Sequence, residues 1–246
     1  MSFNSRYQRQ IAFKDIGEAG QASLRRGRAT IIGVGALGTA IANSLARAGL
    51  GFLRLVDSDR IEESNLQRQM LFDEADARAN SFKASAAARR LGQINSGIVI
   101  EPLVMRVNAD NVVPLVSDVD VVLDGSDNFE VRYMINDACV RLGVPWIYGG
   151  VLADAGVSMN ILPDGPCFRC LMPEKPETGS FATPETAGVL NQITGIIGSI
   201  EAVEAMKIVL GGKDVRRSLL SVSLWDAAFH TIDITPNPAC PTCGHT

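Results

Sequence analysis

The sequence predicts an α/β fold with a doubly wound, mostly parallel sheet and an appended antiparallel half. Two observations indicate this fold. Short apolar runs alternate with helical patterns through residues 29–148, as in successive βαβ units. After Gly150 the pattern changes to short strand-like runs separated by Pro and Gly turns. We expect one domain over residues 1–246, with a first half of residues 1–150 and a second half of residues 151–246.

The expected elements follow one another with short connections. A continuous apolar run such as Ala29–Val34 is typical of a strand buried on both faces of a parallel sheet. In the first half we expect strands at 29–34, 52–56, 98–104, 119–123 and 145–148, and helices at 36–48, 81–94 and 128–142. In the second half we expect a strand or hairpin at 154–162, a mobile loop at 171–186, a long helix at 193–210, and strands at 218–225 and 230–234.

The composition excludes several classes of protein. Of 246 residues, 46% are hydrophobic and 20% charged, which supports a packed core and argues against disorder. The net charge of −4 argues against a nucleic-acid partner, which requires a basic surface. The polar, basic first residues lack the apolar stretch of a signal peptide, and no apolar run approaches the ~20 residues that span a membrane. We therefore expect a cytoplasmic protein with no membrane partner.

A glycine-rich turn follows the first strand and opens a helix. Residues 33–38 read Gly-Val-Gly-Ala-Leu-Gly, and this spacing permits a tight turn, close approach of a phosphate, and close packing of helix on strand. Asp57 ends the next strand, where a carboxylate can accept hydrogen bonds from a ribose. The pattern predicts a Rossmann-type nucleotide site. It does not choose between NAD, FAD, a methyl donor and ATP, and a packing turn without a ligand is the alternative.

Two Cys-x-x-Cys pairs predict a four-cysteine zinc knuckle in the second half. One pair is Cys167 and Cys170, and the other is Cys240 and Cys243. Four thiolates complete a tetrahedral zinc site with no open position, so the metal would be structural. Two redox dithiols or a pair of disulfides are the alternatives. The fifth cysteine, Cys139, lies within a predicted helix and is expected to be a small buried residue.

A further set of polar residues is expected near the glycine turn. It supplies cations, amides and carboxylates beside a phosphate-binding turn, and it consists of Asp59, the run Ser64–Gln69, Lys83 and the pair Asp127-Asn128. Cations offset the charge that develops as pyrophosphate leaves, and a carboxylate can hold Mg²⁺, so this set suits a triphosphate. Hydride transfer has little use for it. A solvated loop with ordinary helix caps is the alternative for any one of these residues, but it explains the whole set poorly.

The chain resembles the MoeB/ThiF/HesA adenylyltransferases, which are bacterial relatives of ubiquitin-activating enzymes. The resemblance runs nearly from end to end. It includes residues 6–10, Arg-Tyr-Gln-Arg-Gln, the glycine turn, and the cysteine pairs. It also includes Asp57, Asp59, the run 65–69, Lys83, Asp127-Asn128-Phe129 with Arg132, and residues 195–207.

The resemblance implies that the C-terminal glycine carboxylate of a small ubiquitin-fold sulfur-carrier protein attacks the α-phosphate of Mg·ATP. The second half would then bind the carrier and zinc, and the enzyme would be a homodimer in which Arg9 reaches the partner's site. Arg9, Asn65, Arg68, Lys83 and Asp127 would act in catalysis, with Asp127 positioning Mg²⁺. The nucleotide-binding residues implied are Gly33, Gly35, Ala36, Gly38, Asp57, Asp59, Ser64, Asn65, Leu66, Gln67, Arg68, Gln69, Lys83, Asp127 and Asn128.

The sequence departs from the family pattern in three places. Pro184 stands where many members have a cysteine that links covalently to the carrier, and proline cannot replace a thiol. The sequence therefore predicts acyl-adenylate formation with a separate sulfur donor. The run between Arg68 and Lys83 is longer than the family usually has, which makes Arg78 a substitute candidate for Lys83. Ala36 stands where many relatives have glycine, which a helix start tolerates.

Three other functions remain as alternatives. One is a family offshoot that adenylates a peptide carboxylate or acts in tRNA modification. Another is an inactive binding scaffold, although such a protein has no need of Arg9, Arg68, Lys83 and Asp127. The third is an NAD dehydrogenase. It is disfavoured because the two histidines, His230 in a predicted strand and His245 in the tail, are poorly placed as proton shuttles.

Overall fold

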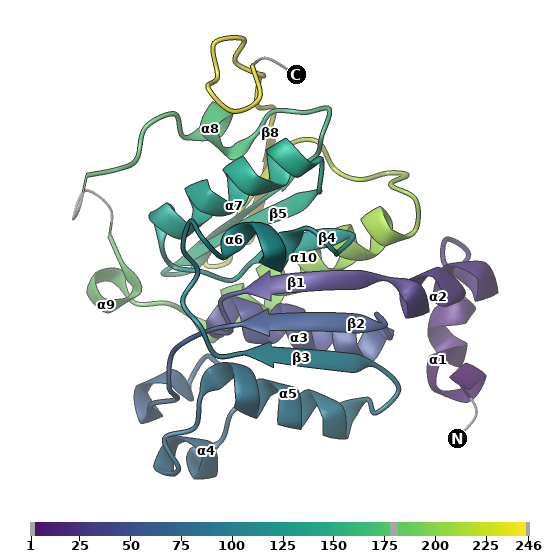
Figure 1. The fold of residues 1–246 in the computed structure, drawn as a ribbon. Helices are drawn as coiled ribbons and strands as arrows, with labels where there is room; N and C mark the ends of the chain where they lie inside the picture. Colours follow the sequence, from purple (N-terminus) through teal and green to yellow (C-terminus); the bar gives the residue numbers. More distant parts are fainter. Residues whose placement is uncertain (1–2, 178–181, 245–246) are drawn as a thin grey trace.

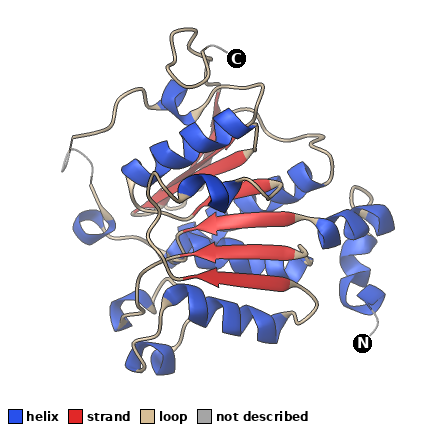
Figure 2. Ribbon diagram, in the orientation of Figure 1, coloured by secondary structure: helices blue, strands red, loops and turns tan. Residues whose placement is uncertain are grey.

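The computed structural model describes residues 3–177 and 182–244, which form an α/β fold around a mixed sheet (Figures 1 and 2). Within these ranges the strand order is β3-β2-β1-β4-β5-β6-β7-β8. The neighbours from β3 to β5 pair in parallel, and those from β5 to β8 pair antiparallel. The strands are β1 Arg28–Ile32, β2 Phe52–Val56, β3 Val99–Leu103, β4 Val121–Asp124, β5 Trp146–Leu152, β6 Ala155–Ile161, β7 Leu219–Ser223 and β8 Ala228–Ile232.

The predicted α/β alternation is confirmed, and β2 and α3 have the predicted bounds. Several short helices were not predicted, among them α1, α2, α4 and α6. The expected loop at 171–186 contains the end of α8 and most of α9, while its residues 178–181, like His245, lie outside the described residues. The helices are α1 Phe3–Ile11, α2 Gly17–Arg26, α3 Ala36–Ala48, η1 Glu63–Asn65, α4 Glu74–Arg78, α5 Lys83–Ile94, α6 Val112–Val116, α7 Phe129–Leu142, α8 Phe168–Leu171, α9 Pro184–Ala187 and α10 Asn191–Val209.

Two apolar clusters cover the two faces of the sheet. Alternate residues of a strand point to opposite faces, and in β1 Ile31 enters one cluster while Ile32 enters the other. The first cluster includes residues of α3, α5 and α10, and the second includes residues of α6, α7 and α8. Helices therefore pack on both sides of the parallel strands, as a doubly wound arrangement requires.

The sheet is continuous across the expected boundary between the two halves. Residue 150 lies inside β5, which pairs with β6 from Trp146 opposite Ile161 to Leu152 opposite Ala155. The long helix α10 then crosses beside α3 and buries Ile193 and Ile197. The antiparallel strands thus extend the same sheet that carries the glycine turn.

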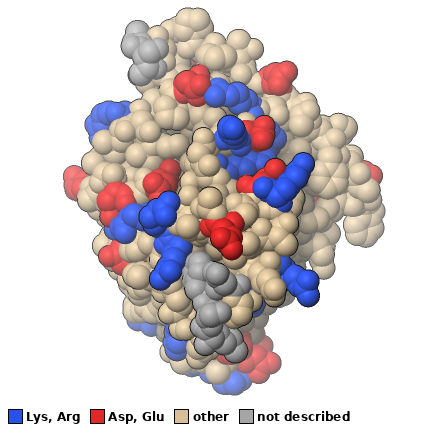
Figure 3. Space-filling model, turned by 90° about the vertical axis from the view of Figure 1, so that its right-hand side faces the viewer, with Lys and Arg blue, Asp and Glu red and all other residues tan. Residues whose placement is uncertain are grey.

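Charged residues on the side that carries α1 and α2 are mixed in sign. Figure 3 shows Lys and Arg side chains interspersed there with Asp and Glu. Two of the chain's ion pairs are Arg28–Asp118 at 2.9 Å and Arg54–Glu101 at 2.6 Å. Separately, none of the described helices combines the length and the apolar character needed to cross a membrane.

A matched pair of helical glycines tests how closely α3 packs on the sheet. A Cβ atom at Gly38 would overlap the carbonyl oxygen of Gly33, whereas a Cβ atom at Gly92 of α5 would meet nothing within 4 Å. We expect Gly38→Ala to lower the free energy of unfolding by roughly 1–3 kcal/mol, as overpacking does. Gly92→Ala should raise it by about 0.5–1 kcal/mol, since alanine is the better helix former. Urea unfolding measures both, and equal effects would contradict the close contact.

Candidate functional site

The glycine turn lies where the strand order reverses, between β1 and β4. A ligand crevice forms at this kind of switch point, because neighbouring connections leave the sheet in opposite directions. The turn after β4 lies against the turn after β1, with Gly125 N donating to Ile32 O at 2.7 Å. Gly33 has φ +88°, and a Cβ atom on it would clash with the backbone of Gly125. The backbone groups of both turns therefore lie at the carboxyl ends of the parallel strands.

Asp57 is fixed beside this turn by two backbone donors. Val34 N donates to its Oδ2 and Asp59 N to its Oδ1, each at 2.7 Å. Burial raises the pKa of Asp57, and the two backbone hydrogen bonds and the charge of Lys83 oppose that rise. Its remaining lone pairs can accept hydroxyl hydrogens, as a ribose-binding carboxylate must.

Lys83 reaches the same region from the start of α5. Its Nζ pairs with Asp59 Oδ2 at 3.0 Å, and its side chain is largely buried while that of Asp59 is 66% exposed. The longer run after Arg68 folds into α4 and a turn, which returns the chain to Asp59, where Lys83 N donates to Asp59 O. Arg78, the substitute candidate, is exposed and pairs with Glu74 within α4. The geometry therefore favours Lys83 over Arg78.

The segment from Ser64 to Gln69 lies against the glycine turn. A Cβ atom at Gly35 would be 3.8 Å from Gln69 Nε2. Asn65 is buried and caps η1 in a reciprocal pair with Glu62, and the Nη1 of Arg68 donates to Ser64 O at 2.8 Å. The side chain of Leu66 packs on the first apolar cluster, whereas that of Gln67 is exposed. Gln69 is buried, and its Oε1 has no hydrogen-bond partner among the described residues.

Asp127 and Asn128 lie at the start of α7, directly after the β4 turn. Both are exposed, and Asn128 Oδ1 accepts from Glu130 N at 2.8 Å, so its side chain caps the helix. Arg132, one turn along, holds the β4 turn by donating to Asp124 Oδ2 at 2.8 Å and to Ser126 O at 2.7 Å. Asp127 is therefore placed at the site with an exposed carboxylate.

Arg9 does not join this cluster within one chain. It is exposed on α1, and Figure 1 shows α1 beyond the amino ends of β1–β3, opposite to the ends that carry the glycine turn. α1 is fixed there by Tyr7, whose hydroxyl accepts from Asn95 Nδ2 at 2.8 Å. Of the predicted catalytic residues, Arg9 is the one that the fold places away from the others.

The two cysteine pairs meet, as the sequence predicts. The sulfurs of Cys167 and Cys240 are 3.6 Å apart, those of Cys170 and Cys243 are 3.4 Å apart, and all four lie within 4.8 Å of one another. Four sulfurs at ~2.3 Å from one tetrahedral ion would be about 3.8 Å apart, so this group could hold a metal ion. Cys139 is buried in α7, as expected, and burial raises the pKa of its thiol to about 12.

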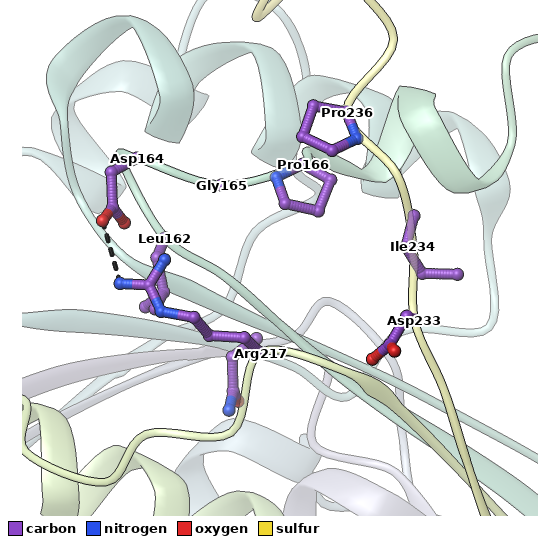
Figure 4. Close-up of a pocket in the computed structure, with 9 residues that line it drawn as sticks. Leu162, Asp164, Gly165, Pro166, Arg217, Asp233, Ile234 and Pro236 are labelled. Atoms are coloured by element: carbon purple, nitrogen blue, oxygen red, sulfur yellow. Dashed lines mark hydrogen bonds and ion pairs between the residues drawn. The ribbon is translucent and has the colours of Figure 1, made fainter.

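A surface pocket of about 290 Å³ is lined by residues outside the glycine-turn region (Figure 4). It lies between the loop after β6 and the segment after β8, and the exposed pair Arg217–Asp164, at 2.8 Å, stands on one side of it, opposite Asp233 and Ile234. None of the residues that line it belongs to the predicted nucleotide-binding set. They are Asn160, Leu162, Asp164, Gly165, Pro166, Arg217, Asp233, Ile234 and Pro236.

Sequence reasoning missed one buried acid next to the site. Glu201 of α10 is fully buried, and neither carboxyl oxygen has a hydrogen-bond partner among the described residues. A Cβ atom at Gly149 would collide with it, so it lies against β5. Burial and the nearby Asp124 raise its pKa well above the usual range, and Arg132 and Arg216 only partly oppose this. An acid between apolar residues of a predicted core helix is the signal that could have identified it.

The raised pKa of Glu201 predicts how stability depends on pH. Above pH 4.5 the unfolded chain releases a proton that the folded chain keeps, so this group lowers wild-type stability as pH rises towards its folded pKa. We expect the stability of Glu201→Gln relative to the wild type to increase above that pH, by up to about 1.4 kcal/mol per pH unit. Urea unfolding from pH 5 to 8 measures this, with exposed Glu74→Gln as the control. A constant difference would contradict it.

The chain matches known proteins over nearly its whole length. The model of the ThiF family matches residues 7–242. The SAMP-activating enzyme E1 of Haloferax volcanii is 40% identical, over 97% of this chain and 88% of that protein. The sulfur carrier protein ThiS adenylyltransferase of Bacillus subtilis is also 40% identical, over 97% of this chain and 71% of that protein. The sulfur carrier protein adenylyltransferase of Thermus thermophilus is 36% identical, over 97% and 90%.

Solved structures agree on the fold. A crystal structure of Escherichia coli MccB with ATP superposes with a TM-score of 0.85, at 23% identity over 98% of this chain and 75% of that one. A MccB structure with succinimide also gives 0.85, at 22% identity, over 97% and 74%. At such identity the likeness concerns the fold alone. The match to the family model and the identity with named relatives show that the chain belongs to the ThiF family and is an adenylyltransferase.

Proposed function

We propose that this enzyme adenylates the C-terminal glycine carboxylate of a small ubiquitin-fold sulfur-carrier protein. One observation carries the proposal: Asp57, Lys83 and the Ser64–Gln69 segment converge on the glycine turn at the switch point. The relatives named for ThiS and SAMP support a carrier protein as the substrate.

In the proposed reaction a carboxylate oxygen of the carrier attacks the α-phosphorus of ATP. The bond from that phosphorus to the bridging oxygen breaks, and pyrophosphate leaves with the electron pair. Backbone N–H groups of the turn and of the α3 start would bind phosphate, since helix N-termini favour anions. Asp57 would hold the ribose. Asn65, Arg68 and Lys83 would stabilise negative charge as it develops on the phosphate oxygens.

Lys83 would have to exchange its partner when the nucleotide binds. Its Nζ is now 3.0 Å from Asp59 Oδ2. A phosphate oxygen can compete for this ammonium because Asp59 is largely exposed and water can solvate the carboxylate that is left. Asp127 would hold Mg²⁺, which neutralises phosphate charge during the displacement, and its exposed carboxylate at the start of α7 suits that role.

We propose that the four-cysteine cluster holds a structural zinc ion. Four thiolates are the donor set that zinc takes in closed structural sites. The cluster joins the loop after β6 to the segment after β8. The ion would therefore fasten the C-terminal segment to the second half of the sheet.

We propose that sulfur comes from a separate donor. The chain has five cysteines, of which four form the cluster and Cys139 is buried with a thiol pKa raised to about 12. A thiol must ionise and reach its target to act as a nucleophile, and neither condition suits Cys139. Nothing in this set supplies the loop thiol whose place Pro184 takes.

We also propose that the enzyme works as a homodimer. The position of α1 prevents Arg9 from reaching the glycine turn of its own chain (Figure 1). A second subunit that presents its α1 to this site would complete the predicted set of cations.

Two large exposed side chains on the β7–β8 hairpin support a protein substrate. Trp225 is 83% exposed and Phe229 is 57% exposed, and large exposed apolar groups mark protein contacts.

ATP–pyrophosphate exchange tests the reaction. We expect exchange that depends on a carrier ending in Gly-Gly, and Arg68→Ala or Asp127→Ala should lower its rate by at least ~100-fold, because each would remove transition-state stabilisation. Arg78→Ala, which breaks only an exposed pair within α4, is the matched control and should retain the wild-type rate. If no Gly-Gly carrier supports exchange, an offshoot with another substrate or an inactive scaffold becomes the better explanation.

A trapping experiment tests the separate sulfur donor. We expect no covalent adduct between carrier and enzyme on non-reducing gels after incubation with ATP, since no described thiol is available. Changing Cys139 to Ala should not alter the carrier-dependent exchange rate. A band that dithiothreitol removes and that maps to any cysteine of this chain would overturn the expectation.

A further inference from the structure

Two adjacent residues of α7, Asn136 and Asp137, contact the Cys-x-x-Cys turns, and Asp137 contacts both of them. Asp137 Oδ1 accepts from Thr242 Oγ1 at 2.8 Å and from Arg169 Nε at 2.9 Å, while its Oδ2 accepts from Arg169 Nη2 at 2.7 Å. Arg169 stands between the two cysteines of the first pair, and Thr242 stands between those of the second. One carboxylate therefore bridges the two Cys-x-x-Cys turns without touching a sulfur atom in any of these bonds.

Asn136 fixes the first turn from the interior. It is fully buried, its Oδ1 accepts from Phe168 N at 2.8 Å, and its Nδ2 donates to Asp137 Oδ1 at 3.1 Å. The Phe168 ring is buried against Tyr148 and Tyr133, with centroids 4.8 and 5.3 Å away. The first cysteine pair is thus attached to the core through backbone, ring and side-chain contacts that need no metal.

The turn that carries Cys240 and Cys243 relies more on contacts with neighbouring segments to hold its position. It belongs to the C-terminal segment that follows β8, outside the strands and helices of the described chain. Its cysteines lie 3.6 and 3.4 Å from those of the first turn, and Asn237 N donates to Cys170 Sγ at 3.4 Å. The bond from Thr242 to Asp137 joins this segment to α7 without a sulfur atom.

We propose that Asp137, supported by Asn136, is a positioning residue that holds the two cysteine pairs at metal-binding distance before the ion arrives. This inference rests on the proposed zinc site. A bidentate Arg–carboxylate pair has a fixed geometry, so Arg169 sets the orientation of Asp137, and Asp137 then sets the position of Thr242. Assembling the four thiolates in advance reduces the ordering that metal binding must otherwise impose.

Zinc affinity and release measured in variants test this role. We expect Asp137→Ala to lower the zinc affinity by roughly 10–100-fold, as loss of outer partners typically does, and to speed release to a chelator. Thr242→Val should have a smaller effect in the same direction, because it removes only the second turn's bond. The double variant should bind no more weakly than Asp137→Ala, since Thr242 acts through Asp137.

The controls separate this inference from the zinc proposal. Asp164→Ala removes an exposed ion pair with Arg217 and should leave zinc affinity unchanged. A wild-type protein without zinc would contradict the zinc site itself. Zinc in the wild type with unchanged affinity and release in Asp137→Ala would overturn the positioning role alone. If Asp137→Ala fails to fold by circular dichroism, Thr242→Val and Arg169→Lys decide the matter, and wild-type zinc release in both would overturn it.

Discussion

The contact between the backbone turns after β1 and β4 is the constraint on which the rest of the site depends. Gly33, Gly38 and Gly125 leave no space for a Cβ atom where these two turns and the start of α3 meet. This contact brings the end of β4, and with it Asp127, beside the glycine turn. The hydrogen bond from Val34 N to Asp57 then adds the end of β2. Three strands that are separate in the sequence thus contribute to one group of residues at the carboxyl ends of the parallel strands.

Helix α7 connects the region of the glycine turn to the cysteine cluster. It begins directly after Asn128, and its later turns carry Asn136 and Asp137, which hold the cysteine turns. Between them, the Tyr133 hydroxyl contacts the carbonyl oxygens of Met172 and Glu174 at 3.0 and 2.9 Å. The segment that leaves the first cysteine turn therefore follows α7 towards the glycine turn. A structural ion at one end of this helix would steady the chain near the other end.

The sequence was most informative where local signals agreed. The bounds of α3 were predicted because a glycine turn opens that helix and Gly49 closes it with φ +83°. The short helices α4 and α6 were missed because single turns carry almost no periodic signal. The run between Arg68 and Lys83 is longer than the family usually has. In the structure this run contains α4, and the folded chain returns the start of α5 to Asp59.

By itself the sequence determined the α/β class, the glycine turn with Asp57, and the identity of the four clustered cysteines, since each depends on residue type and short spacing. The tertiary structure decided that Lys83 faces Asp59, that Arg9 lies at the opposite end of the strands, and that Asp137 bridges the cysteine turns. It also decided that Glu201 is buried without a hydrogen-bond partner among the described residues. These facts follow from contacts between distant segments, and no local pattern in the chain encodes such distances.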